Sequence, residues 1–439
     1  MAKDGQVITA EYTIPGLHVR EHEIDVPLDW AFPDGQRITV FARELVAAHR
    51  KHEDLPLILH LQGGPGGKGP RPLDASGWIG ALLERYRLVL LDQRGTGRST
   101  RVDAARMAAF DDGEAAAAFL ACFRADSIVR GAEHLRATDF DGRRWSTIGQ
   151  SYGGWLTLSY LSFAPEALSA CLVLGGLGSL RPSAAEVYRR TFPRMLAKNA
   201  AYEQRYPGDT ATISRIADLL TATDVHLPDG DRFTVPRLQF LGNTFGMQHG
   251  FEEVHWMVDE ALATSGDRLT DTFLSQVQTA TDFADGPLWA ALQEPLYGDP
   301  HSGATGWAAD AEQARHPEFA PDARPLRLTG EAMFRWMFDD IRLLRPFAPA
   351  VDVLAERTDW SPLFDRDRLA ANEVPVAAAV YFDDLYVDAG LSLETADQVG
   401  NLQTWVTNEW QHDGIRASGD AVVRHLLRLV DEQGGPLRG

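Results

Sequence analysis

Residues 148–154, IGQSYGG, decide how the rest of the sequence is interpreted, because they place a serine among glycines directly after an apolar segment. The longer segment RRWSTIGQSYGGWLTLSYL (143–161) is typical of a strand, a sharp turn and a helix. Three glycines flank Ser151, namely Gly149, Gly153 and Gly154. Glycine is favoured where a turn leaves no room for a side chain, so we expect the Ser151 hydroxyl to be exposed at the turn. A glycine-rich turn without chemistry is the alternative.

A catalytic serine needs a histidine as base and a carboxylate that orients this base, because an unactivated hydroxyl is a weak nucleophile. When the serine lies at such a turn, both partners follow it in the chain, the acid before the histidine. The apolar segment 377–384 (AAAVYFDD) ends in carboxylates, and His412 lies in the loop NEWQHDG before the last amphipathic helix. We expect His412 to be the base and Asp384 to be the acid, with Asp383 and Asp388 as competitors.

The same chemistry needs backbone N–H donors for the oxyanion that forms on the substrate. One donor is expected from Tyr152, which follows the serine, and another from the glycine loop 63–66 (GGPG). This loop could also be a simple turn or a phosphate-binding loop, but the GK[ST] sequence that completes a phosphate-binding loop is missing. In DQRGTGRS (92–99), we interpret Asp92 and Arg94 as a structural pair that supports the glycine loop.

Apolar segments that end in polar or glycine-rich loops recur in the first part of the chain and indicate buried parallel strands. They lie at 55–67, 86–99, 143–150 and 167–178. The segments 17–30 and 36–46 instead alternate polar and apolar residues around a turn, which predicts antiparallel strands. Strands that alternate with helices predict an α/β fold with a mostly parallel sheet.

The alternation stops after residue 181, where the segments have helical periodicity, frequent aromatic residues and no convincing strand. A strand pattern returns at 374–388. We therefore predict one sheet domain in two parts, 1–181 and 346–439, with an inserted helical cap domain at 182–345.

Composition narrows the possible partners of this 439-residue chain. Hydrophobic residues make up 44% and charged residues 24%, which is ordinary for a folded globular protein. The formal net charge of −20 disfavours nucleic acid and anionic membranes as partners and favours cationic ligands. The two cysteines, Cys122 and Cys171, predict neither a disulfide framework nor a cysteine metal site. The N-terminus has no apolar signal region, so we predict a cytoplasmic protein.

Taken together in this order, GGPG, DQRGTGRS and GQSYGG resemble the motifs of the proline iminopeptidases, serine peptidases of the α/β-hydrolase superfamily. The resemblance extends through VYFDDLYVD and EWQHDG and so covers nearly the whole chain. It implies an α/β-hydrolase fold with a helical cap and the removal of an N-terminal residue, preferably proline, from peptides. It implies Ser151 as nucleophile, His412 as base and Asp384 as its orienter. Gly64 and Tyr152 would supply the oxyanion donors.

Recognition of a free amino terminus is the second implication of the resemblance, since this family uses cap glutamates to bind the substrate ammonium. A carboxylate is also the direct physical partner of a buried ammonium. The candidates are Glu252, Glu294 and Glu331, each polar within an aromatic setting. Aromatic residues that could line the pocket for a proline ring are Trp256, Tyr297, Trp307, Phe334 and Trp336. One departure from the family is Gln62, where a histidine is usual.

Two other functions are compatible with parts of this pattern. An esterase or other acyl hydrolase could use the same triad, because fold and triad do not fix the acyl group. A non-catalytic binding protein on this scaffold is disfavoured by the intact set Ser151, Asp384 and His412. The expected substrate is a peptide with a free N-terminus, and the expected mechanism needs no metal and no cofactor.

Overall fold

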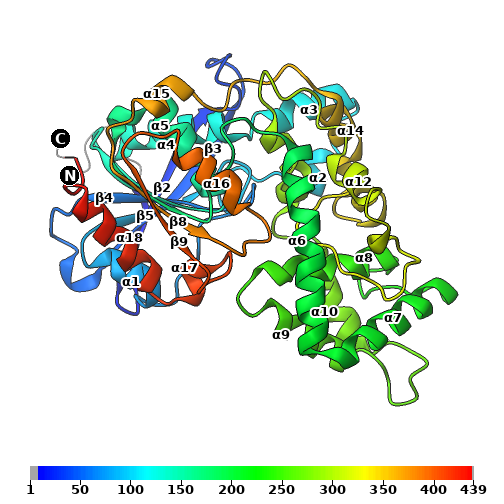
Figure 1. Cartoon of the computed structure of the whole chain (residues 1–439). Helices are drawn as coiled ribbons and strands as arrows, with labels where there is room; N and C mark the ends of the chain where they lie inside the picture. The colour runs from blue at the N-terminus through cyan, green and yellow to red at the C-terminus, as the bar shows by residue number, and fades with distance from the viewer. Residues whose placement is uncertain (1–7, 438–439) are drawn as a thin grey trace.

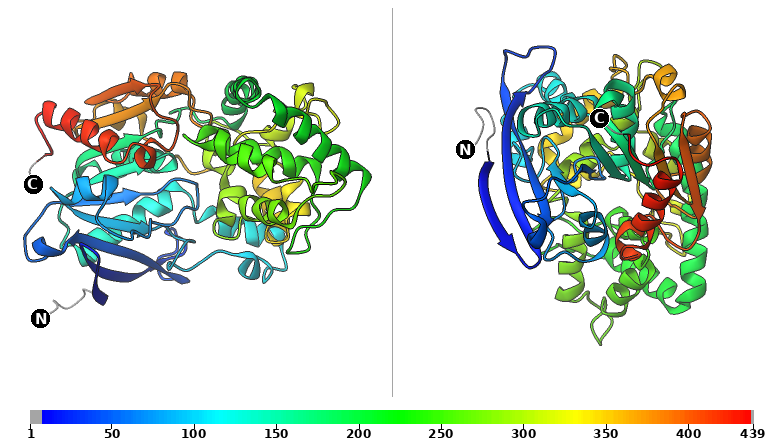
Figure 2. Two further views of the ribbon diagram at one scale, coloured as in Figure 1. Left: turned by 90° about the horizontal axis from the view of Figure 1, so that it is seen from below. Right: turned by 90° about the vertical axis from the view of Figure 1, so that its left-hand side faces the viewer.

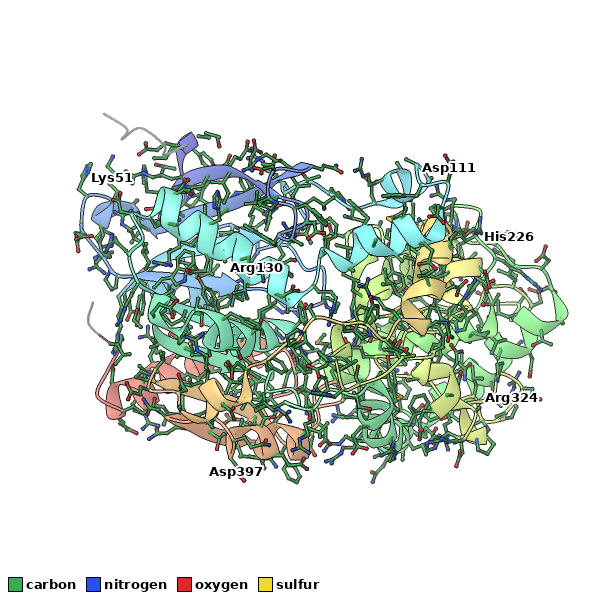
Figure 3. All side chains as sticks on the ribbon, turned by 90° about the horizontal axis from the view of Figure 1, so that it is seen from above. Lys51, Asp111, Arg130, His226, Arg324 and Asp397 are labelled. Carbon is green, nitrogen blue, oxygen red and sulfur yellow. The ribbon has the colours of Figure 1, made fainter. Side chains whose placement is uncertain are left out.

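The computed structural model describes residues 8–437 and contains one nine-stranded sheet in the order β1-β2-β3-β5-β4-β6-β7-β8-β9. Figure 1 shows this sheet on one side and a helical region on the other. The turned views of Figure 2 show the same two-part arrangement, with the sheet and its helices next to the helical region. Figure 3 labels His226 and Arg324 in the helical region and Lys51 at the opposite end of the molecule.

Antiparallel pairing is confined to one side of the sheet, where β1 pairs with β2, β2 with β3, and β3 with β5. These strands are β1 (Ile8–Ile14), β2 (Leu17–Pro27), β3 (Arg37–Ala47) and β5 (Arg87–Asp92). The predicted antiparallel pair is confirmed, since Leu17 lies opposite Ala47 and Pro27 opposite Arg37. Strand β1 was not expected from the sequence, because its side chains are mostly exposed and it lacks a buried apolar run.

The remaining strands run parallel, as the buried apolar segments predict. They are β4 (Leu57–Leu61), β6 (Trp145–Gln150), β7 (Leu168–Leu174), β8 (Val376–Tyr381) and β9 (Leu402–Thr407). In parallel strands the carboxyl ends meet at one edge of the sheet, where ligands bind in such folds. The glycine loop, Ser151 and Asp384 all follow these carboxyl ends.

Each face of the sheet buries its own apolar core, because successive strand residues point to opposite faces. Leu57, Leu59 and Leu61 belong to one core together with α4 (Ala125–Asp139) and α5 (Tyr152–Phe163). Ile58 belongs to the other core, together with α1 (Gly77–Leu83) and α18 (Ala421–Glu432). The sheet is therefore the middle of three layers. The shorter helices α15 (Arg366–Ala370), α16 (Ala389–Ala396) and α17 (Gly414–Ala417) complete this part. Three others, α2 (Ala104–Met107), α3 (Gly113–Ala121) and α14 (Ala348–Glu356), lie on the side of the helical region in Figure 1, where α3 contacts α14.

The helical region lies between β7 and β8 in the chain and includes the long helix α6 (Ala184–Arg205). Ser183 accepts a hydrogen bond from the Glu186 backbone N–H, so a serine and a glutamate three residues later mark the start of α6. The other helices are α7 (Pro207–Ala222), α8 (Val235–Gln239), α9 (Gly250–Asp259), α10 (Asp271–Thr281), α11 (Pro287–Leu292), α12 (Ala308–Gln313) and α13 (Met337–Asp340). We call this region the cap, and its limits of 182 and 345 stay a prediction.

Candidate active site

Ser151 lies between the end of β6 and the first residue of α5, with a backbone φ of 56° and ψ of −124°. This left-handed conformation is unfavourable for a residue with a side chain and is typical of functional sites that the surrounding structure holds in place. The Ser151 backbone N–H donates to the Leu174 carbonyl at 2.9 Å, which ties the turn to β7. The predicted strand, sharp turn and helix are confirmed.

The glycines around Ser151 are required by close backbone contacts. A Cβ atom on Gly149 would lie 2.2 Å from the Gly153 carbonyl oxygen, and one on Gly153 would lie 1.9 Å from the Leu61 carbonyl oxygen. A Cβ atom on Gly154 would lie 2.5 Å from the Gly176 carbonyl oxygen. Any side chain at these positions would push the turn away from β4 and β7, so the glycines allow α5 to start directly at the sheet edge.

His412 and Asp384 form a buried pair, with His412 Nδ1 2.7 Å from Asp384 Oδ2. The other oxygen, Asp384 Oδ1, accepts hydrogen bonds from the backbone N–H groups of Tyr386 (2.8 Å) and Val387 (3.1 Å). Asp383 is exposed, so the structure brings Asp384 to the histidine and leaves its neighbour in solvent. Because both oxygens of Asp384 have fixed partners, the carboxylate holds the imidazole in one orientation.

The third competitor for the acid position, Asp388, has a structural role. It accepts a hydrogen bond from the Leu391 backbone N–H at the start of α16. It also forms ion pairs with Arg190 and Arg194 of the cap helix α6, at 3.2 and 2.7 Å. Asp388 therefore joins the cap to the sheet rather than contacting His412.

Ser151 and His412 line the same cleft, which has a volume of about 640 Å³. Burial alone would lower the pKa of His412, but the adjoining Asp384 carboxylate outweighs this effect and the pKa lies above its usual range. Within residues 8–437, no hydrogen bond joins the Ser151 hydroxyl to the imidazole, so the two groups must come closer before a proton can pass between them. Catalytic hydrogen bonds are often long without substrate and tighten when it binds.

Gly64 and Tyr152, the two predicted oxyanion donors, are close to Ser151. Gly64 lines the cleft, and Tyr152 is the first residue of α5, so its N–H has no acceptor within the helix. The neighbouring Gly63 N–H is already used, because it donates to the Gln62 side-chain oxygen at 3.0 Å. Gln62, the departure from the family, thus turns back onto its own loop.

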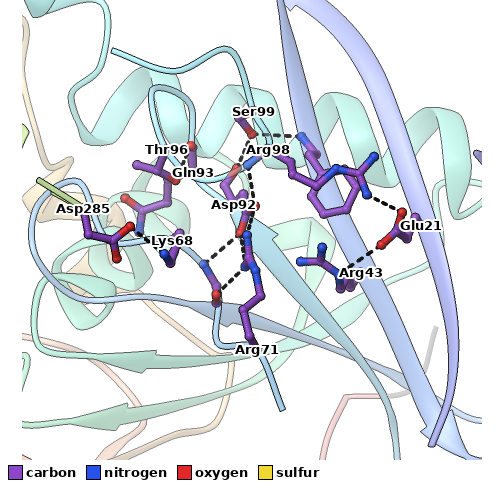
Figure 4. A network of polar contacts seen from close by, with 12 residues as sticks. Glu21, Arg43, Lys68, Arg71, Asp92, Gln93, Thr96, Arg98, Ser99 and Asp285 are labelled. Atoms are coloured by element: carbon purple, nitrogen blue, oxygen red, sulfur yellow. Dashed lines mark hydrogen bonds and ion pairs between the residues drawn. The ribbon is translucent and has the colours of Figure 1, made fainter. Parts of the chain in front are cut away.

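Asp92 holds the segment that follows the glycine loop, as Figure 4 shows, but not in the predicted way. Asp92 accepts hydrogen bonds from the Gly69 N–H at 3.0 Å and from both terminal nitrogens of Arg71 at 2.7 and 2.6 Å. Arg94 instead donates to backbone carbonyls, including that of Pro27 at 2.6 Å. The predicted Asp92–Arg94 pair is therefore wrong. The partner of Asp92 is Arg71, and spacing along the chain could not show this contact.

A second, narrow cavity of about 50 Å³ opens beside Ser151 on the cap side. Four residues line both this cavity and the larger cleft: Gly64, Ser151, Glu331 and Tyr386. Its other walls are mostly apolar and include Trp155, Leu296 and Tyr297. A site that holds one water needs roughly 10–15 Å³ measured in this way, so the cavity accommodates a group about as large as one small ring.

Glu331 is the cap glutamate that the structure brings to Ser151. It lies in the wall shared by the two spaces, and Trp289 Nε1 donates a hydrogen bond to its Oε1 at 3.2 Å. Burial raises the pKa of Glu331 to about 7. A carboxylate that is poorly solvated and has few donors is suited to bind an ammonium group.

The other two predicted glutamates have different surroundings. Glu294 is 4% exposed, and its oxygens accept hydrogen bonds from the backbone N–H groups of Ala308 (3.1 Å) and Ala309 (2.9 Å) at the start of α12. Burial raises the pKa of Glu294 to about 7, although these hydrogen bonds act to lower it. Glu252 lies outside both spaces and is paired with Arg205 on the surface, at 2.6 Å. The structure thus groups only Glu331 with the triad.

Of the predicted aromatic residues, only Tyr297 lines the narrow cavity. Trp256 is 62% exposed, whereas Trp307 packs on Phe338. Phe334 and Trp336 stack on each other. Four aromatic residues around the site were not predicted from the sequence: Trp78, Trp155, Trp289 and Tyr386. Trp155 directly follows the glycines of the turn, and this position could have indicated from the sequence that it lies near Ser151.

The described residues contain no metal cluster, disulfide or membrane-spanning helix. Residues 8–437 contain no group of three or more histidine, cysteine or acidic side chains that could hold a metal ion. Cys122 and Cys171 are not joined by a disulfide. None of the helices described in this range is long and apolar enough to span a bilayer.

The chain is similar to known proteins over nearly its whole length. A family model described as the alpha/beta hydrolase fold matches residues 56–219, which confirms the predicted fold class. The chain is 41% identical to a proline iminopeptidase of Aeromonas sobria over 95% of this chain and 98% of that protein. It is 33% identical to a proline iminopeptidase of Aspergillus aculeatus over 94% of each. A solved proline iminopeptidase structure from Mycobacterium smegmatis matches with 12% identity and a TM-score of 0.43, over 94% of this chain and 98% of that one.

Proposed function

The chain belongs to the proline iminopeptidase family, and we propose that it is a serine exopeptidase that releases an N-terminal residue, preferably proline, from peptides. The observation that carries this proposal is the position of Ser151 in a wall shared by the cleft of His412 and the narrow cavity beside Glu331. A nucleophile, a base and an ammonium-binding carboxylate therefore surround one reacting carbon. The substrate class that meets all three is a peptide with a free amino terminus.

The reaction begins with attack of Ser151 Oγ on the carbonyl carbon of the N-terminal residue. His412 Nε2 takes the hydroxyl proton, and Asp384 stabilises the imidazolium through Nδ1. The carbon–nitrogen bond then breaks, and the imidazolium gives its proton to the leaving amine. Water next attacks the acyl-enzyme with His412 again as base, which releases the free amino acid and restores the serine.

The negative charge on the substrate oxygen is stabilised by the N–H groups of Gly64 and Tyr152. The start of α5 strengthens this effect, because the N-terminal end of a helix carries a partial positive charge. These donors are fixed before substrate binds, so no reorganisation is needed during the reaction.

Specificity for the N-terminal residue follows from the two features on the cap side. Glu331 pairs with the substrate ammonium, and the narrow cavity with Tyr297 takes the side chain. The limited volume and apolar walls favour a compact ring over a long or charged side chain. Glu294 and Glu252 take no direct part in this proposal, because their oxygens already bind α12 and Arg205.

An esterase that uses the same triad is the second candidate, since the acyl-transfer steps are identical. Glu331 favours the peptidase, because a buried carboxylate beside the nucleophile has no partner in a neutral ester. The predicted cytoplasmic location also remains a proposal, which fractionation of cells can test.

A panel of aminoacyl arylamides tests the proposed function. We expect turnover of the proline arylamide to exceed that of the others, to be lost when the substrate amine is acetylated, and to be lost in Ser151→Ala. Short-chain p-nitrophenyl esters serve as the comparison. Fast ester turnover together with equal hydrolysis of acetylated and free proline arylamide would establish the esterase instead.

A further inference from the structure

The charges that line the cleft are unevenly distributed around Ser151. Glu331 lies on the side of the narrow cavity, whereas three cations line the cleft: Lys68, Arg71 and Arg416. This is unusual for a chain with a net charge of −20, whose overall field repels anions.

Two of these cations already have carboxylate partners. Lys68 Nζ lies 2.5 Å from Asp285 of the cap, and Arg71 binds Asp92 through two nitrogens, as Figure 4 shows. Arg416 is exposed, and within residues 8–437 its side chain forms no ion pair. The uncompensated positive charge in the cleft is therefore that of Arg416.

Arg416 lines the same cleft as His412 and Ser151. The leaving nitrogen receives its proton from His412, so the residues that follow it extend from the imidazole. Arg416 belongs to α17, four positions after His412 in the chain, and it lines the same cleft together with Ile415. His60, which lines the same cleft, adds no further positive charge, since it is 2% exposed, stacks on Trp78 and is neutral because burial lowers its pKa to about 3.

On the basis of the proposed function, we propose that Arg416 binds the C-terminal carboxylate of short peptides, so that dipeptides and tripeptides with both ends free are preferred substrates. One residue adds at most about 3.6 Å of extended chain, so a carboxylate one or two residues beyond the cleaved bond lies within about 7 Å of that bond. The ammonium then faces Glu331 and the carboxylate faces Arg416, which matches the charges of a zwitterionic peptide. Arg416 acts on substrate selection and takes no part in bond cleavage.

Matched substrates test this subsite. The kcat/KM ratio of prolyl-alanine to its C-terminal amide is measured for the wild type, Arg416→Gln and Arg416→Glu, each normalised to that variant's own proline arylamide turnover. Because an exposed charge pair is worth at most about 1 kcal/mol, we expect Arg416→Gln to lower the acid-to-amide ratio by about threefold to fivefold and Arg416→Glu to lower it further. High salt should lower the acid-to-amide ratio of the wild type, but it should not lower the ratio of either variant.

Arg428→Gln is the matched control, because Arg428 is an exposed arginine on α18 outside the cleft. Its acid-to-amide ratio should equal that of the wild type. The comparison between variants removes the intrinsic difference in reactivity between an acid and an amide. Equal ratios in the wild type, Arg416→Gln and Arg416→Glu would overturn the carboxylate subsite and leave the proposed function intact. Failure of the wild type to cleave proline arylamide would overturn the proposed function and this subsite together.

Discussion

The sheet side and the cap side of the cleft hold their polar side chains in different ways. On the sheet side, Ser151 and Asp384 each follow the carboxyl end of a buried strand, and backbone hydrogen bonds fix both. On the cap side, three glutamates in similar aromatic segments have three different environments. Glu331 lies in the cleft, Glu294 accepts hydrogen bonds from the start of α12, and Glu252 is on the surface.

This contrast shows that similar local sequences do not have similar roles when packing decides the environment. Glu331 and Glu294 are both buried, and burial raises the pKa of each to about 7. They differ in the kind of donor, because Glu294 accepts hydrogen bonds from two backbone N–H groups at the start of α12, whereas the donors beside Glu331 are the side chains of Trp289 and Gln293. Bonds to a helix start fix Glu294 in the fold, whereas Glu331 lines the space beside Ser151 and can meet a ligand there.

The largest effect is expected on the sheet side, from Asp384→Asn. The amide would favour the wrong tautomer of His412 and would no longer stabilise the imidazolium, so kcat should fall by about 10⁴-fold. Steady-state kinetics with proline arylamide measure this loss. Asp383→Asn is the matched control, since this exposed neighbour does not contact His412, and its activity should stay near that of the wild type. A greater loss in Asp383→Asn than in Asp384→Asn would show that Asp383, and not Asp384, orients His412.

An intermediate effect is expected on the cap side, from Glu331→Gln. Loss of a charge-assisted hydrogen bond to the substrate ammonium should lower kcat/KM for proline arylamide by about 10-fold to 100-fold. Hydrolysis of a small ester without an amino group should change much less. If both substrates lost activity equally, Glu331 would support the triad rather than bind the amine.

The pH profile sharpens the same comparison. Ionisation of Glu331 at a pKa of about 7 and deprotonation of His412, whose pKa is raised, both increase activity as the pH rises. The kcat/KM of the wild type should therefore increase between about pH 6 and 8, and the Glu331→Gln profile should retain only the histidine ionisation. A wild-type rise that is complete below about pH 5 would contradict these shifts.

The smallest effect on catalysis is expected for Glu294→Gln, which should instead lower stability. An amide can replace only one of the two carboxylate acceptors at the start of α12 and sets its own N–H₂ against the other backbone N–H, so the loss is expected to be about 1–3 kcal/mol even though the buried charge is removed. Thermal unfolding detects it as a lower Tm. Glu252→Gln provides the surface comparison, because an exposed ion pair contributes at most about 1 kcal/mol. A large loss of amine recognition with unchanged Tm would move Glu294 into the substrate site.

The sheet could be predicted because its information is local. Period-two alternation identified β2 and β3, and apolar runs that end in glycine loops identified the parallel strands. Strand β1 escaped prediction because it is mostly exposed and carries a weak apolar pattern. The same locality placed Ser151, Asp384 and His412, since each lies at a strand end in a fixed chain order.

The cap could not be predicted to the same depth, because its contacts join residues that are distant in sequence. Nothing in the segment around Glu294 shows that the start of α12 returns to it, and nothing around Glu252 shows the partner Arg205. The Asp92–Arg94 pair failed for the same reason, since Arg71 reaches Asp92 from a different loop. The local sequence predicts strands and turns well, but it does not show which distant residue forms an ion pair or hydrogen bond with a charged side chain.

The narrow cavity beside Ser151 admits one side chain, and the carboxylate of Glu331 adjoins it where the backbone of a longer substrate would have to continue. An internal proline has an acylated nitrogen with no charge, so in place of an ion pair it would leave the carboxylate desolvated and would collide with the wall. Endoproteolytic cleavage is thus disfavoured by both shape and charge. The loops of a folded protein have no free amino terminus that could reach Ser151. We therefore expect intact folded proteins to resist cleavage by the active enzyme even when no inhibitor is present.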